Sequence, residues 1–179
     1  MAEDSTNLII VESPSKARTL KRFLGDKYQI EASVGHIRDL PKNDLGVDVE
    51  NGFKPTYVAS EDKSKVISQL KSLTKKAGIL YLATDPDREG EAIAWHLVEL
   101  LKPTIPVKRL AFHEITKSAI QESFDHTRDI DASLVSAQEA RRILDRLWGY
   151  KVSAKLWQNV KGGLSAGRVQ SPAVKIVVD

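Results

Sequence analysis

The sequence predicts an α/β fold in which a mostly parallel sheet is flanked by helices. Two short apolar runs lie at residues 7–11 and 79–83, and residues 107–111 are a further candidate strand. Continuous apolar runs of this length are typical of strands buried on both faces. Segments with helical periodicity separate them, and this alternation indicates a parallel sheet with right-handed crossovers.

The first helix is predicted directly after the first strand. Ser13 is a good N-cap and Pro14 suits the first helical turn, so a helix should cover about residues 15–24. Residues 28–34 alternate weakly and predict a second strand. Residues 35–57 are rich in Gly, Pro and Asn and predict a long loop, which is usually functional in a compact domain.

The alternation continues beyond this loop. Apolar residues recur at helical spacing over residues 63–76, and again from Ile93 to Pro103. The run at 79–83 predicts a strand between these two helices. After the last predicted strand, Thr116 is placed to cap a further helix.

Beyond the α/β region the periodicity is helical only. It predicts one long helix over about residues 134–148, a second over 152–160, and a third after a flexible loop at 162–167. We therefore predict two domains: residues 1–127 contain the sheet, and residues 128–179 begin a helical domain that is truncated.

The composition is that of a soluble globular protein, with 28% charged and 41% hydrophobic residues. The formal net charge is only +3, but residues 141–175 contain eight Lys or Arg and a single acid, Asp145. A basic stretch of this kind is typical of a surface that meets phosphates, although a solvated helical face has the same composition.

Several classes of protein are excluded or disfavoured. The chain has no cysteine, so it contains neither disulfides nor cysteine-ligated zinc. It shows no signal-peptide pattern and no apolar run of membrane-spanning length, so we expect a cytoplasmic protein. Residues 177–179 lie in an apolar segment without a helix stop signal, and we expect the sequence to be part of a longer protein.

An acidic loop follows the predicted strand at 79–83. Asp85, Asp87 and Glu89 would lie at the carboxyl end of that strand, and Glu12 would lie at the end of the first strand. Ligands of open α/β sheets bind at this edge, and closely spaced carboxylates favour a hard cation such as Mg²⁺. The alternative is a solvated turn whose acids cap the next helix.

Two basic residues are further candidates for contact with a phosphate. Lys16 lies one turn into the first helix, where its ammonium group could neutralise a phosphate. His36 follows a glycine in the long loop and could donate to a phosphate or a base. From the residues alone, an ordinary surface lysine and an uninformative loop histidine remain the simpler interpretations.

These residues lie in blocks that resemble the Toprim domain of type IA DNA topoisomerases, bacterial topoisomerase I in particular. The blocks come in order and cover nearly the whole chain. They are Val-Glu-Ser-Pro-Ser-Lys-Ala at 11–17, Ser-Val-Gly-His-Ile-Arg-Asp-Leu-Pro at 33–41, Ala-Thr-Asp-Pro-Asp-Arg-Glu-Gly-Glu-Ala-Ile-Ala-Trp-His at 83–96, Phe-His-Glu-Ile-Thr at 112–116, Ala-Gln-Glu-Ala-Arg-Arg-Ile-Leu-Asp-Arg-Leu-Trp-Gly-Tyr at 137–150, and Gly-Leu-Ser-Ala-Gly-Arg-Val-Gln-Ser at 163–171.

The resemblance implies an Mg²⁺-dependent, ATP-independent enzyme, monomeric and associated with the nucleoid. Such an enzyme cuts one strand of negatively supercoiled DNA with a tyrosine, holds a 5′-phosphotyrosyl link, passes the other strand and reseals. Glu12 then matches a general acid/base that is also a metal ligand, and Lys16 a residue that stabilises charge on the phosphate. Asp85 and Asp87 match metal ligands, with Glu89 in support.

The resemblance also implies a groove for single-stranded DNA in the helical region. Arg142 and Arg146 share a helix face, with Asp145 between them as the expected orienting partner. From the residues alone, an intrahelical ladder of ion pairs is the simpler interpretation. The remaining residues that match DNA contacts are His36, Lys151, Gln158, Ser165, Ala166, Gly167, Arg168, Val169 and Gln170.

The family's nucleophilic tyrosine has no counterpart here. None of Tyr28, Tyr57, Tyr81 and Tyr150 has its Arg- and Thr-rich setting, so we expect it downstream. Tyr81 is predicted to be buried in a strand and Tyr150 to pack at a helix end. Two alternatives stay open: another Toprim enzyme, such as a primase or nuclease, and a non-catalytic DNA-binding module. Topoisomerase III and reverse gyrase are relatives that this region separates poorly.

Overall fold

The structure is a computed structural model that describes residues 6–179. Residues 1–5, which belong to the segment without a signal-peptide pattern, lie outside the described residues. The described chain forms two compact units. The first contains residues 6–39 and 58–136, and the second contains residues 40–57 and 137–179. The predicted domain division at residue 127 stays a prediction.

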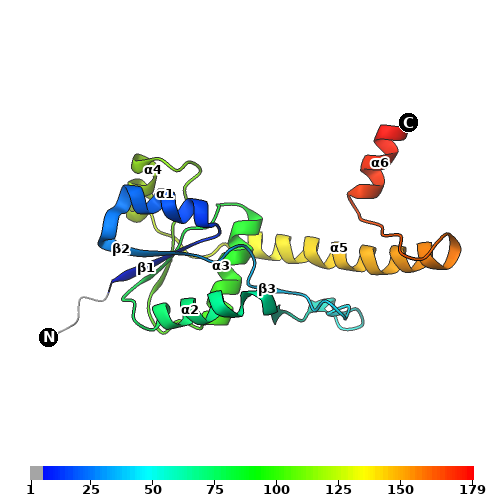
Figure 1. The fold of residues 1–179 in the computed structure, drawn as a ribbon, viewed down its shortest axis with the longest axis horizontal. Coiled ribbons are helices and arrows are strands. Elements are labelled where there is room, and N and C mark those ends of the chain that lie inside the picture. Colours follow the sequence, from blue (N-terminus) through cyan, green and yellow to red (C-terminus); the bar gives the residue numbers. More distant parts are fainter. Residues whose placement is uncertain (1–5) are drawn as a thin grey trace. The chain divides into compact units, whose positions relative to one another are not determined.

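The first unit is built on a four-stranded parallel sheet, as the sequence predicts (Figure 1). The strand order is β2-β1-β7-β8, with the strands paired in parallel throughout. Its members are β1 (Asn7–Val11), β2 (Tyr28–Ala32), β7 (Leu80–Leu82) and β8 (Val107–Arg109). Because β1 and β7 are neighbours, the residues that follow them meet at the same carboxyl edge.

Helices cover both faces of this sheet. They are α1 (Pro14–Leu24), α2 (Ser64–Thr74), α3 (Arg88–Leu101) and α4 (Lys117–Asp125), with the short 3-10 helices η1 (Gly25–Lys27) and η2 (Glu61–Lys63). Successive strand residues point to opposite faces. Leu8 and Ile10 therefore join one core with residues of α2 and α3. Ile9 and Val11 join a second core with residues of α1 and α4.

The predicted helix caps are confirmed. Ser13 Oγ accepts a hydrogen bond from Lys16 N at 3.4 Å and begins α1. Thr116 Oγ1 accepts from Ala119 N at 3.3 Å and begins α4. Both caps satisfy an amide that has no partner within the helix, so they fix where each helix starts.

The predicted long loop contains more order than its composition indicates. β3 (Arg38–Asp39) pairs antiparallel with β6 (Val58–Ala59), and β4 (Val47–Asp48) pairs antiparallel with β5 (Lys54–Pro55). The β4–β5 turn is closed by Asp48 Oδ1, which accepts from the amides of Glu50 and Asn51. Such a side-chain cap is local and leaves little periodicity in the sequence.

The prediction of two helices over residues 134–160 was wrong. A single helix, α5 (Ala132–Asn159), runs for 28 residues. Gly149 costs a helix interior about 1 kcal/mol relative to alanine, but it keeps its amide donor, and the segment has no proline. The predicted third helix is present as α6 (Gln170–Val178). Within residues 6–179, no helix combines the length and apolar character needed to cross a membrane.

Candidate metal and DNA site

The carboxyl edge of the sheet brings Glu12, Lys16 and Asp85 together, as the strand order requires. Lys16 Nζ donates to Asp85 Oδ1 at 2.5 Å and forms an ion pair with Glu12 Oε1. Lys16 and Asp85 are 69 positions apart in the chain, and Glu12 precedes both, yet the three side chains meet at one point. Two carboxylates from neighbouring strand ends converge on a single cation, here the lysine ammonium group.

The electrostatics of Lys16 follow from this contact. Burial lowers the pKa of Lys16, but the hydrogen bonds that it donates to Asp85 and Glu12 and the charges of both carboxylates outweigh this effect, so its pKa is raised above the usual value. The ammonium group therefore stays charged at neutral pH. The same position can supply positive charge to a phosphate.

The other two predicted ligands, Asp87 and Glu89, have different partners. Asp87 Oδ1 accepts from Gly90 N at 2.8 Å and caps α3. Glu89 Oε2 lies 3.4 Å from His36 Nε2, an ion pair when the histidine is protonated. Across residues 6–179, no three side chains of Asp, Glu or His form a group able to hold a metal ion. The four predicted ligands are near one edge but do not converge.

Glu12 retains an unused acceptor. Its Oε2 atom is buried and, among residues 6–179, has no hydrogen-bond partner. A buried carboxylate oxygen without a donor carries a desolvation cost, which a bound cation or a donor from a ligand would relieve. The donor set at this edge, carboxylate oxygens only, has the chemistry that Mg²⁺ prefers.

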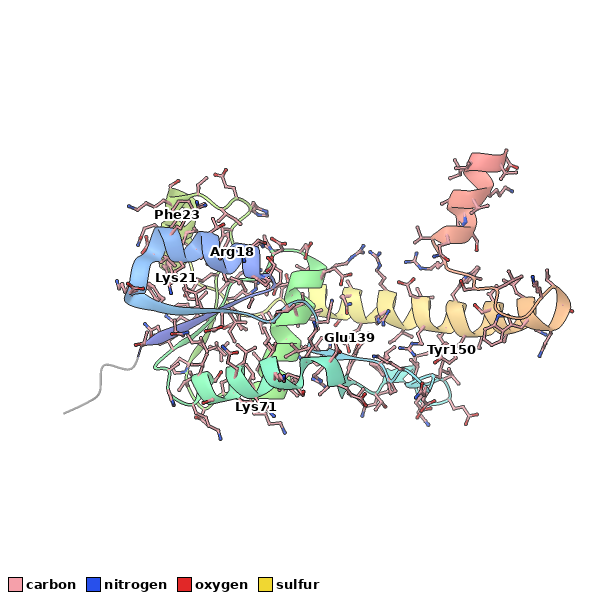
Figure 2. All side chains as sticks on the ribbon, in the orientation of Figure 1. Arg18, Lys21, Phe23, Lys71, Glu139 and Tyr150 are labelled. Carbon is pink, nitrogen blue, oxygen red and sulfur yellow. The ribbon has the colours of Figure 1, made fainter. Side chains whose placement is uncertain are left out.

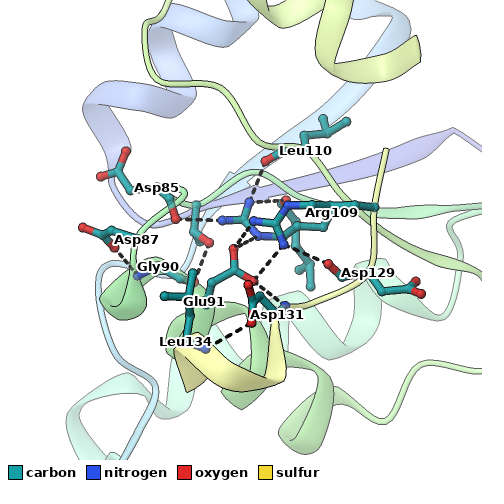
Figure 3. A network of polar contacts seen from close by, with 12 residues as sticks. Asp85, Asp87, Gly90, Glu91, Arg109, Leu110, Asp129, Asp131 and Leu134 are labelled. Atoms are coloured by element: carbon teal, nitrogen blue, oxygen red, sulfur yellow. Dashed lines mark hydrogen bonds and ion pairs between the residues drawn. The ribbon is translucent and has the colours of Figure 1, made fainter. Parts of the chain in front are cut away.

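A buried arginine lies directly behind the acidic loop (Figure 3). Arg109 Nε donates to Glu91 Oε1 at 2.9 Å, and Nη2 donates to the backbone carbonyl of Asp85 at 2.7 Å. Nη1 donates to the carbonyls of Leu82 at 2.9 Å and Leu110 at 2.6 Å. The Arg109 and Glu91 side chains are both 0% exposed. One guanidinium group thus joins two strand ends, helix α3 and the acidic loop.

Glu91 is the shared acceptor of this network. It also accepts from Arg128 Nη2 at 2.6 Å and from the Asp131 amide at 3.0 Å. Burial raises the pKa of Glu91, but the hydrogen bonds from Arg128 and the Asp131 amide, with the charges of Arg109 and Arg128, hold it below its usual value. The carboxylate is therefore ionised at neutral pH.

The sequence reasoning missed this network. Sequence patterning predicts only that the acids of this turn cap the next helix, and it predicts no role for Arg109. The local sequence carries no clear signal for this pair, because Glu91 follows Arg88 and Glu89 closely and Arg109 follows Lys108 directly. The two residues are 18 positions apart, and the fold brings them together.

Gly90 fits between the helix and the loop. A Cβ atom built at Gly90 would lie 2.0 Å from the Asp85 carbonyl oxygen, so any other residue would displace the loop backbone. Thr84 Oγ1 donates to the Gly90 carbonyl at 2.6 Å. The backbone of the acidic loop is therefore packed closely against the first turn of α3.

In the second unit, Arg146 is held by backbone carbonyls. It donates to Pro41 O at 2.7 Å, Asp44 O at 3.1 Å and Leu40 O at 3.3 Å, and it lies 5.3 Å from the centre of the Tyr150 ring. Asp145 accepts from Arg168 Nε at 2.8 Å and pairs with Arg141 at 3.8 Å. Its role as orienting partner of Arg142 and Arg146 stays a prediction.

A cavity of about 650 Å³ lies beside Arg146 in this unit. It brings together five residues predicted to bind DNA. Tyr150, Ser153 and Trp157, which were not predicted to bind, also line it. Tyr150 lies within α5 and is 42% exposed, so its predicted place at a helix end was wrong (Figure 2). The predicted residues in the lining are Arg142, Asp145, Arg146, Ser165 and Ala166.

The other predicted DNA contacts lie outside this lining. Lys151 and Gln158 are exposed on α5. Gly167, Arg168 and Val169 precede α6, which begins at Gln170. His36 belongs to the first unit, beside Glu89.

The chain is similar to known proteins over nearly all of its length. Residues 7–115 match the Toprim domain, and residues 129–179 match the DNA topoisomerase family. The chain is 55% identical to DNA topoisomerase 1 of Streptomyces coelicolor, an alignment that covers 99% of this chain and 20% of that protein. The solved structure of full-length topoisomerase I from Thermotoga maritima aligns with a TM-score of 0.87 at 50% identity, over 96% of this chain and 29% of that one. The chain thus spans about a fifth of the length of its curated relative.

Proposed function

This chain belongs to the Toprim domain family, and we propose that it forms the metal-binding region and part of the DNA groove of a type IA DNA topoisomerase. The whole protein would relax negatively supercoiled DNA by Mg²⁺-dependent, ATP-independent breakage and rejoining of single strands through a 5′-phosphotyrosine. The observation that carries the proposal is the convergence of Glu12, Lys16 and Asp85 at one sheet edge. The match of residues 129–179 favours a topoisomerase over a primase or nuclease.

The roles proposed for this edge are those that the family resemblance implies, and the contacts support them. Glu12 would act as general acid/base toward the 3′-oxygen that leaves, since one of its oxygens is buried without a donor. Lys16 would stabilise charge on the scissile phosphate. A phosphate would compete with Asp85 and Glu12 for the ammonium group, whose raised pKa keeps it charged.

Mg²⁺ is the cofactor that this donor set fits best. Glu12, Asp85 and Asp87 would hold it, with Glu89 in support, and when bound the ion supplies positive charge that offsets the phosphates. Lys16 already shows that Glu12 and Asp85 accept one shared cation. Since Asp87 and Glu89 have other partners here, binding by all four carboxylates would require those two side chains to turn toward Glu12 and Asp85.

Single-stranded DNA is the proposed partner of the second unit. Arg142 and Arg146 line the cavity together with Tyr150 and Trp157, which are 42% and 56% exposed. Cationic groups beside exposed aromatic rings bind phosphates and unstacked bases respectively. The contacts at Lys151, Gln158 and residues 165–170, with His36 in the first unit, remain part of this proposal. We further propose that the protein is a monomer that works in the cytoplasm, at the nucleoid.

A binding experiment tests the DNA assignment. Anisotropy of a labelled single-stranded oligonucleotide should show an affinity for this chain that falls as salt rises. The Arg142→Ala, Arg146→Ala double variant should bind several-fold more weakly. The Lys71→Ala, Lys75→Ala double variant removes the same charge from exposed positions of α2 and its C-cap, and it should bind nearly normally. Equal affinity of all three proteins would contradict the proposal.

A second experiment tests the tyrosine assignment. Tyr28 stacks on Phe124 at 5.1 Å, and Tyr81 is 9% exposed in β7, so both are packing residues. The burial predicted for Tyr81 is confirmed. We expect this chain to bind DNA but to leave supercoiled plasmid uncut in the presence of Mg²⁺. A covalent link between this chain and a 5′-phosphate would contradict the absence of the nucleophile.

A further inference from the structure

The side chain of Arg109 contacts the acidic loop at its backbone, through the carbonyl oxygen of Asp85. The Asp85 side chain is 54% exposed, whereas its carbonyl oxygen accepts from Arg109 Nη2 at 2.7 Å. The same carbonyl lies against the first turn of α3, where Gly90 leaves no room for a Cβ atom. The loop is thus fixed through its backbone from two sides, while its carboxylate remains accessible.

We propose that Arg109 is a positioning residue that sets the backbone of the acidic loop for cation binding, and that Glu91 orients Arg109 for this task. The inference rests on the proposed function, because it assumes that the loop binds a metal ion. The Arg109 side chain reaches Asp85 at its backbone carbonyl and not at its carboxylate, and Glu91 accepts from Arg109. Each would act through the Asp85 backbone, as groups behind a metal ligand commonly do.

The geometry calls for arginine. The guanidinium group of Arg109 donates four hydrogen bonds in different directions, one to a carboxylate and three to backbone carbonyls. A lysine has three donors on one atom and cannot span acceptors that are spread around a plane. Arg109→Lys would therefore keep the charge and lose some of these hydrogen bonds. The bond to Asp85 should be among those lost, because Nη2 lies farthest from the aliphatic part of the side chain.

Arg128 offers a matched control. It donates to the same carboxylate, Glu91, at 2.6 Å, and to the Asp129 carbonyl at 2.9 Å. No bond from Arg128 to the acidic loop is present among the described residues. Arg128→Lys therefore makes the same chemical change next to Glu91 without removing a support of Asp85.

The test measures the loop and the metal separately on the whole 179-residue chain. In the metal-free proteins, the ¹H–¹⁵N signals of residues 84–90 should move in Arg109→Lys and stay in place in Arg128→Lys. In a titration with Mg²⁺, Arg109→Lys should bind on the order of tenfold more weakly than the wild-type chain, a size typical for groups behind metal ligands. Arg128→Lys should stay within about twofold of the wild-type chain.

A second variant covers the case in which Arg109→Lys fails to fold. Gly90→Ala displaces the same carbonyl from the other side without changing any charge, and it should weaken Mg²⁺ binding in the same way. Moved loop signals with undiminished Mg²⁺ affinity in either variant would overturn the positioning role. If the wild-type chain itself shows no Mg²⁺ response at the loop, the proposed metal site fails instead, and the metal-free signals alone decide whether Arg109 sets the loop.

Discussion

The acidic loop of the first unit and the arginine cavity of the second hold their charges in opposite ways. Behind the acidic loop, Glu91 and Arg109 are 0% exposed, and each has several partners. Around the cavity, Arg168 and Asp145 are 36% and 35% exposed. The first arrangement buries its paired charges away from water, whereas the second keeps its paired charges partly exposed, where a ligand can reach them.

The difference indicates different tasks. A cation site requires its ligands within fractions of an ångström, and a dry network of charges provides that precision at the cost of tolerating few changes. A groove for flexible single strands gains from side chains that adapt to each base and phosphate. Substitutions should therefore lower the free energy of unfolding strongly in the first region and only weakly in the second.

The largest effect is expected for Glu91→Ala. It would leave Arg109 buried beside no carboxylate, and removing one partner of a buried pair typically costs about 3–5 kcal/mol. Urea unfolding measures this loss in the free energy of unfolding. Glu89→Ala, on the same helix but beside His36, is the control and should cost less than about 1 kcal/mol. Similar costs for both would remove the distinction between buried and exposed charge.

His96, which also lies on α3, should make the free energy of unfolding depend on pH, with a change of about 1–2 kcal/mol between about pH 7 and about pH 5.5. Burial and the charges of Arg38 and His36 lower its pKa from 6.5 to about 3. Between these values the unfolded chain binds a proton that the folded chain rejects. The free energy of unfolding is therefore unaffected by this proton above pH 6.5, and below that pH it falls by up to about 1.4 kcal/mol per pH unit.

The His96→Gln variant should flatten this dependence between pH 7 and pH 5.5. Urea unfolding at several pH values measures the slope, and the exposed His113 supplies the control variant His113→Gln. An unchanged slope in His96→Gln would show that this histidine is protonated in the folded state.

A gain of up to about 1 kcal/mol is expected for Gly149→Ala in the second unit. An added Cβ would meet only the Ala166 carbonyl oxygen, at 3.9 Å, so the helix gains propensity without a clash. The thermal midpoint should rise. A lower midpoint would mean that α5 needs the flexibility of glycine at this position.

The smallest effect is expected for Asp145→Asn. Its bond to Arg168 is about one third exposed at both ends, and such pairs contribute about 0.2–1 kcal/mol. Unfolding in urea should show a change within that range. A loss as large as that of Glu91→Ala would mean that the cavity is as rigidly built as the acidic loop.

The parts of the fold that the sequence predicted are those with local or periodic signals. β1 and β7 follow from apolar runs, β2 follows from a weak alternation, and the starts of α1 and α4 follow from Ser13 and Thr116. The continuity of α5 was missed because a single glycine weakens a helix without ending it. The β4–β5 hairpin was missed because its order comes from one side chain, Asp48.

The residues of the candidate site fall into the same two groups, those with a signal in the sequence and those without one. Strand-end positions placed Glu12 and Asp85 at one edge, and pairing of the strands brought them to Lys16. The partners of Arg146 are backbone carbonyls about a hundred residues away, which no spacing rule connects to an arginine. The fork of Arg109 is of the same kind, since it depends on carbonyls from three segments.

The most direct test of the account is a titration of the ¹⁵N-labelled chain with Mg²⁺ in the absence of DNA. The account predicts saturable shifts centred on Glu12, Asp85 and Asp87, with loss of the response in an Asp85→Asn, Asp87→Asn double variant. Exposed acids away from the edge, such as Asp48, should not respond. Shifts spread evenly over exposed acids, or no shifts at the sheet edge, would contradict the proposed metal site. Such a result would favour the interpretation of the acidic loop as a helix-capping turn.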